Sequence, residues 1–247
     1  MFPALPPNTL YLLEISALAL LPSALWLLYY LRQDVHAEPR SVILKLFLAG
    51  LLLPPFVASA ESAVQGWVVA FGFSPLALIF LLGAASLEEI AKYLAALVIF
   101  YHNKEFDEPV DAMIYLVVVA LGFAAGENIV VVLNTALHHP DESIALLLSL
   151  RFVGANLLHT LTSGIVGYFI ARSYFFKEPL GSLRGLVIAT VLHTFFNFFI
   201  LQSSPGPNVF LPQYILLTIA LLIGGIVVVW SDFHKLKRYG VSNLTLS

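Results

Sequence analysis

Two adjacent glutamates and a lysine lie inside an apolar stretch, where ionisable side chains are costly. Glu88, Glu89 and Lys92 interrupt a run that is otherwise hydrophobic from residue 76 to residue 101. A single acid or base near the centre of a membrane helix costs roughly 2.5–3.5 kcal/mol on insertion scales. A chain that keeps three of them is expected to use them, facing a protein interior or a water-filled cavity.

The spacing of these residues separates their expected roles. Glu88 and Lys92 are four residues apart, so they share one face of a helix and can form an ion pair. Glu89 points about 100° away on the same helix. Because one ion pair needs only one carboxylate, the second glutamate exceeds what a structural role requires.

Three later apolar stretches carry polar residues of a similar kind. They hold Phe123, Glu127 and Asn128 in one stretch, His159 and Ser163 in the next, and His193 and Asn197 in the last. At about 1.5 Å per residue, the acids and histidines fall near the middle third of a hydrocarbon core about 30 Å thick. Scattered defects would not share one depth, so we expect four helices to bring these residues together.

The composition places this chemistry in a membrane. Of the 247 residues, 60% are hydrophobic and 11% are charged, against about 25% charged in a soluble domain. The net charge of −3 gives no indication of nucleic-acid binding, and the absence of cysteine excludes disulfides, thiolate nucleophiles and thiolate metal ligands. We predict an all-α, polytopic transmembrane bundle.

The apolar stretches predict about seven spans, since each span needs roughly 20 residues. Their approximate limits are 10–31, 42–60, 76–101, 112–137, 151–174, 183–202 and 211–230. Pro54 and Pro55 are expected to kink or end the second span. The apolar piece 66–73 is too short to cross and is expected to be interfacial or re-entrant, and a shorter helix is expected before the fifth span.

Basic residues predict the orientation. With the N-terminus outside, ten of the twelve Lys and Arg residues fall in inner loops, as the positive-inside rule requires. Of the other two, Lys92 lies within a span, and Arg151 is expected to snorkel to the outer interface. Glu14 and Glu61 are also expected at the interface. The N-terminus lacks a basic region, so we expect the first span to be retained rather than cleaved.

We therefore predict a single integral domain over residues 1–247 in the cell (cytoplasmic) membrane, with its C-terminus cytoplasmic. The catalytic core is expected at about 76–202, because this range holds the polar residues within the spans. Its expected partners are the lipid bilayer and a membrane-anchored protein substrate, without nucleic acid.

Four motifs, in this order, resemble those of the PrsW family of intramembrane proteases. They are Glu88-Glu89-x-x-Lys92, Phe123-x-x-x-Glu127, His159 with Ser163, and His193-x-x-x-Asn197. That family belongs to a clan with the CAAX prenyl endopeptidases and bacteriocin-processing membrane proteins. Glu127 favours the PrsW branch, because the CAAX branch usually has histidine there, whereas Asn197 departs from an aspartate that is frequent in the family.

The resemblance implies hydrolysis of a peptide bond in a membrane-anchored protein, which in known members is an anti-sigma factor. Hydrolysis needs an activated water, a donor for the oxyanion and a proton for the leaving amine. We predict that Glu88, assisted by Glu127, activates the water. The other expected roles are oxyanion stabilisation by His193 and Asn197, water orientation or proton transfer by His159, pairing of Lys92 with Glu89 or Glu88, and support by Phe123, Asn128 and Ser163.

Alternatives use the same residues. A zinc ion held by Glu88, Glu127, His159 and His193 would activate the same water. No His-Glu-x-x-His pair is present, so the mechanism without a cofactor is slightly favoured at this stage. A proton- or ion-coupled transporter would also use acids and histidines in the membrane, although no inverted repeat is evident. A catalytically silent scaffold that binds a partner helix is a further alternative.

Overall fold

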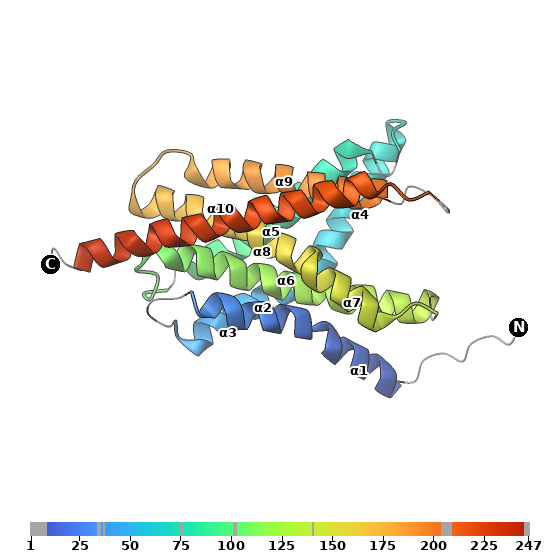
Figure 1. Cartoon of the computed structure of the whole chain (residues 1–247), viewed down its shortest axis with the longest axis horizontal. Helices are drawn as coiled ribbons and strands as arrows, with labels where there is room; N and C mark the ends of the chain where they lie inside the picture. The colour runs from blue at the N-terminus through green and yellow to red at the C-terminus, as the bar shows by residue number, and fades with distance from the viewer. Residues whose placement is uncertain are drawn as a thin grey trace, which may run out of the picture.

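The computed structural model describes residues 9–33, 36, 38–74, 77–100, 103–139, 141–203 and 209–244. Ten α-helices and no β-strand lie in these ranges, so the predicted all-α class is confirmed. The helices are α1 (Thr9–Ala19), α2 (Leu21–Leu31), α3 (Arg40–Leu51), α4 (Pro54–Ala70), α5 (Leu78–Phe100), α6 (Pro109–His138), α7 (Ile144–Val153), α8 (Ala155–Phe175), α9 (Gly181–Ser203) and α10 (Pro212–Leu244) (Figure 1).

Six helical segments of the described chain are long and apolar enough to cross a membrane. They are Thr9–Leu31, Arg40–Ala70, Pro109–His138, Ile144–Phe175, Gly181–Ser203 and Pro212–Arg238. Helix α5 has 23 residues, a length of about 35 Å at ~1.5 Å per residue, but its charged side chains make it less apolar. Together with α5, these segments number seven, in agreement with the sequence.

Prolines set two of the helix boundaries. Pro54 begins α4 directly after α3 ends, as the paired prolines predicted. Pro109 is the first residue of α6, and the residue before it, Glu108, forms a capping box with Asp111. The prediction of a separate interfacial or re-entrant piece at 66–73 is wrong, because α4 continues without interruption to Ala70. The fifth span was predicted to start at about Arg151. Arg151 instead belongs to α7, and α8 begins at Ala155.

Helix α6 forms the centre of the bundle. All of its residues from Pro109 to Gly126 are buried. A Cβ atom added at Gly122 would lie 2.1 Å from the carbonyl oxygen of Phe47, and one at Gly50 would lie 2.0 Å from that of Val119. Glycine on both helices therefore lets α3 and α6 pack backbone to backbone, as expected for small residues at membrane-helix contacts.

The remaining site-bearing helices pack around α6. Helices α5 and α8 both contact α6, and α9 contacts both α5 and α8. The start of α1 and the end of α10 lie at opposite ends of the bundle (Figure 1). This is the arrangement that the seven predicted spans require.

Candidate active site

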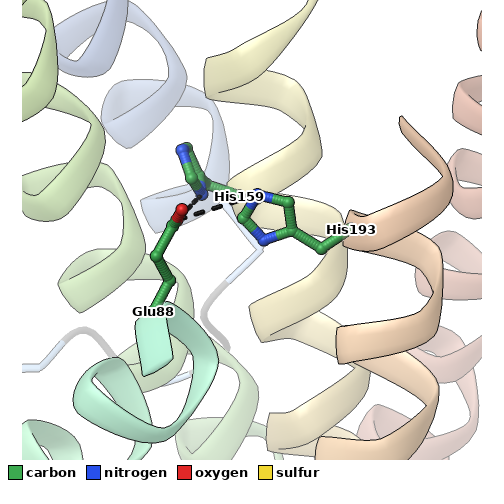
Figure 2. Close-up of side chains that lie close together, drawn as sticks. All are labelled: Glu88, His159 and His193. Atoms are coloured by element: carbon green, nitrogen blue, oxygen red, sulfur yellow. Dashed lines mark ion pairs between the residues drawn. The ribbon is translucent and has the colours of Figure 1, made fainter. Parts of the chain in front are cut away.

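Residues from three helices converge on a buried centre. Glu88 on α5, His159 on α8 and His193 on α9 point toward one another (Figure 2). Oε2 of Glu88 lies 3.8 Å from Nδ1 of His159 and 3.7 Å from Nε2 of His193. One ligand atom from each residue lies within 4.8 Å of the other two, and all three residues are buried. The structure thus brings together residues that the sequence placed at similar depth.

Glu89 holds His193 from the side away from Glu88. Its Oε1 lies 2.8 Å from Nδ1 of His193 and accepts hydrogen bonds from Nζ of Lys92 at 2.7 Å and Oγ1 of Thr162 at 3.1 Å. Lys92 therefore pairs with Glu89, which decides between the two partners considered for it. In the neutral ring, Nδ1–H donates to Glu89, so Nε2 presents its lone pair toward Glu88.

His159 has the reverse arrangement of its two ring nitrogens. Its Nε2 lies 2.8 Å from Oε2 of Glu127, and its Nδ1 lies 3.1 Å from Nζ of Lys92. An ammonium group only donates, so Nδ1 is the acceptor and Nε2–H donates to Glu127. Each histidine therefore has a carboxylate on the nitrogen that faces away from Glu88, a pattern common around metal-binding histidines.

Phe123 supports this arrangement by packing. Its ring lies edge-on to that of His159, with centroids 5.3 Å apart. Nζ of Lys92 lies 5.1 Å from the centroid of the Phe123 ring, within range of a cation–π interaction. The predicted supporting role of Phe123 therefore corresponds to contact with both an imidazole and an ammonium group.

Arg151 lies against the site, with partners that the expectation of a snorkelling side chain did not include. Its Nη2 lies 3.2 Å from Oε2 of Glu127, and its Nε donates to Oδ1 of Asn128 in a short contact. Asn128 is itself bonded to Asn156 at 3.1 Å and to the carbonyl of Ala19 at 3.2 Å. A guanidinium near the end of an apolar run resembles a snorkelling residue, and only the packing of α7 beside α6 reveals its partners.

Glu61 on α4 is a site-region residue that the sequence analysis missed. Its carboxyl group lies near enough to those of Glu88 and Glu127 to interact electrostatically with both. Glu61 was expected at the interface, and the second span was predicted to end at about residue 60. Since α4 runs to Ala70, Glu61 lies near the middle of a helix, and this mid-helix position was the available signal.

Asn197 and Ser163, both predicted, are not joined to the centre. Asn197 is half-buried and makes no hydrogen bond to Glu88 or to either histidine among the described residues. Ser163 is fully buried, and its Oγ has no hydrogen-bond partner in the described part of the chain. No base is therefore positioned to activate Ser163 as a nucleophile.

The donor set at the centre fits a metal ion. Two imidazoles and one carboxylate are a ligand set of catalytic zinc sites, which keep a further position open. Oε2 of Glu88 is buried without a hydrogen-bond partner within the described residues. Glu127, which the sequence analysis placed among four ligands, instead contacts the far nitrogen of His159. Binding at Nδ1 of His159 would displace the hydrogen bond from Lys92.

Removal of the Lys92 ammonium is expected to destabilise the protein strongly. In Lys92→Met, the buried carboxylate of Glu89 loses its cation, which is expected to lower the free energy of unfolding by about 3 kcal/mol or more. Lys235→Met is a matched control, because Lys235 also pairs with an acid three residues earlier at 2.7 Å but is 53% exposed. The control is expected to change stability by about 1 kcal/mol or less. Thermal unfolding in detergent measures both, and equal losses would contradict the expectation.

The fold and the centre define a class of protein. It is a polytopic helical membrane protein in which carboxylates and histidines from separate helices form a buried centre. The family model described as PrsW family intramembrane metalloprotease matches residues 38–226. The chain therefore belongs to the PrsW family of intramembrane proteases, as its four motifs indicated.

Curated relatives agree with this membership. A protein named Protease PrsW from Geobacillus kaustophilus is 36% identical over 149 residues, which are 60% of this chain and 60% of that protein. Protease PrsW from Clostridioides difficile is 26% identical over 235 residues, 92% of each chain. Protease PrsW from Oceanobacillus iheyensis is 24% identical over 213 residues, 85% of this chain and 94% of that protein. No solved structure matches this chain.

Proposed function

We propose that this chain is an intramembrane metalloprotease that hydrolyses a peptide bond of a membrane-anchored protein at the centre formed by Glu88, His159 and His193. The observation that carries the proposal is the convergence of these three buried side chains, with a second carboxylate behind each histidine. Membership of a family described as metalloproteases supports it.

In this proposal, Glu88, His159 and His193 would hold Zn²⁺, which when bound supplies an activated water at neutral pH. Glu89 orients His193 by accepting from its Nδ1–H, and Glu127 orients His159 by accepting from its Nε2–H. Lys92 compensates the charge of Glu89 and so keeps that carboxylate ionised in the apolar interior. The chain's own contribution is a buried site with fixed ring orientations that excludes bulk water.

The tautomers argue for metal over the mechanism without a cofactor. That mechanism requires His193 to donate a hydrogen bond to the oxyanion. In the neutral ring, however, the nitrogen of His193 that faces Glu88 carries a lone pair, because the proton is on the nitrogen bonded to Glu89. Nδ1 of His159 also carries a lone pair, which accepts a hydrogen bond from Lys92 when no metal is bound. Lone pairs on these two nitrogens suit a cation and not a developing anion.

The proposal also includes a class of substrate and an orientation in the membrane. The centre lies inside the bundle, so its substrate is a chain that enters the membrane, and an anti-sigma factor is the candidate that the family resemblance implies. The protein is placed in the cell membrane with its N-terminus outside and its C-terminus cytoplasmic. The distribution of Lys and Arg residues and the opposite positions of the two described ends support this orientation.

Reconstitution tests the proposal directly. The purified chain is placed in liposomes with a set of single-span substrates, and new termini are identified by mass spectrometry. We expect cleavage of at least one substrate at a bond within its membrane span or at the edge of the span. Liposomes without the chain are the control. Cleavage confined to bonds in soluble domains, with intact spans, would contradict the proposal.

A further inference from the structure

Arg151 reaches from α7 to two consecutive residues of α6. Its Nη2 lies 3.2 Å from Oε2 of Glu127, and its Nε donates to Oδ1 of Asn128. The guanidinium group has five donors in a rigid plane, so it can bind both residues at once, which an ammonium group does less well. Both bonds lie beside the proposed centre, yet the proposed function gives Arg151 no role.

Glu127 connects Arg151 to His159. One oxygen of Glu127, Oε2, accepts from both Arg151 and Nε2 of His159. The Glu127 side chain is 26% exposed, against 3% for His159, so a carboxylate without its second donor is free to turn toward water. Arg151 therefore restricts the carboxylate from which the His159 ring takes its orientation.

Arg151 also contributes to the attachment of α7. Leu148 is the only fully buried residue of this ten-residue helix, and Ile144 and Leu147 pack against the same apolar cluster. The ring of Phe152 stacks on that of Trp26, with centroids 5.3 Å apart. The helix ends at Val153, and the φ of −96° and ψ of −90° at Gly154 interrupt the path into α8. Polar bonds add to these contacts: Arg151 bonds to α6, and Nε1 of Trp26 donates to the carbonyl of Phe152 at 2.9 Å.

We propose that Arg151 is a positioning residue that holds the His159 ring in place through Glu127, so that a complete site requires α7 to be seated against α6. The inference rests on the proposed function. Arg151 acts through another residue, because its side chain is hydrogen bonded to Glu127 and Asn128 and, within the described part of the chain, not to Glu88 or the histidines.

Arg151→Gln is expected to weaken the site without altering substrate binding. Loss of a group that orients a metal ligand typically costs about 10–100-fold in metal affinity or activity. We expect a fall in kcat in that range, with KM changed by less than about twofold. Zinc affinity, measured by competition with a chromophoric chelator and without substrate, is expected to fall by a similar factor.

The matched control is Arg172→Gln. Arg172 lies on α8 and pairs with Glu178, and it is 13 residues after His159, or about 20 Å along the helix. The control removes an arginine–glutamate pair of the same kind at the membrane edge. Neither kcat nor zinc affinity is expected to change.

Two further variants test the route through Glu127. The double variant Glu127→Gln/Arg151→Gln is expected to be no more impaired than Glu127→Gln alone, because the two residues act in series. Arg151→Lys retains the charge but not the bidentate geometry, so we expect an effect between those of the parent and Arg151→Gln. This variant gives the same comparison if Arg151→Gln does not fold.

Several results would overturn the inference. Unchanged zinc affinity and kcat in Arg151→Gln would do so, as would additive losses in the double variant. A lower melting temperature with normal zinc affinity per folded molecule would make Arg151 purely structural. If the parent neither binds zinc nor cleaves, the proposed function itself fails. If the parent binds zinc and cleaves substrate, and Arg151→Gln does both equally well, only the role proposed for Arg151 is refuted.

Discussion

Glu88→Gln is expected to reduce cleavage of a membrane-anchored substrate by about 10³-fold or more. The substitution preserves the size of the side chain but removes the charge of the carboxylate that faces both histidines. Loss of that charge removes either a metal ligand or a general base, so the expected loss holds under both mechanisms. Initial rates in liposomes, with substrate and product resolved by gel, measure the effect.

Glu14→Gln is the matched control for this experiment. Glu14 is an exposed acid on α1, so the same substitution there tests the general effect of losing a carboxylate from this membrane protein. Its cleavage rate is expected to equal that of the parent. His193→Ala is expected to match the loss in Glu88→Gln. If both Glu88→Gln and His193→Ala leave cleavage unchanged, the protease assignment fails.

Removal of metal is expected to abolish activity reversibly. We expect the purified chain to contain about one zinc ion per molecule, since the three ligands form one site with an open position. Treatment with a strong chelator is expected to reduce cleavage by at least about 100-fold, and stoichiometric Zn²⁺ is expected to restore it. Metal content measured by mass spectrometry distinguishes this result from inhibition by the chelator itself.

Two histidine variants provide a controlled test of the metal content. His193→Ala removes a proposed ligand and is expected to abolish zinc binding. His138→Ala removes an exposed histidine at the end of α6, whose Nδ1 lies 3.1 Å from the carbonyl oxygen of Asn134, and is expected to retain the full zinc content. Full activity in a chain proven free of metal would refute the metal mechanism. The mechanism in which glutamates alone activate the water would then be favoured.

The sequence by itself determined the membrane fold and the helices that carry the site. Charged residues are so costly in hydrocarbon that Glu88, Glu89 and Lys92 stand out in one apolar stretch without any structural information. Pro54 also predicted the break between α3 and α4, because loss of a backbone donor is a local effect. Depth along each helix follows from a fixed rise per residue, so the sequence could predict that acids and histidines from four helices lie at a similar depth.

Only the tertiary structure decided which side chain contacts which. Two adjacent glutamates look equivalent in sequence, but the rotation of α5 against α8 and α9 directs Glu88 toward the space between both histidines and Glu89 toward Nδ1 of His193. The same applies to Glu61 and Arg151, whose partners lie on other helices. Rise along a helix is intrinsic to the backbone, whereas rotation about its axis is set by packing against its neighbours, including the glycine contacts of α3 with α6.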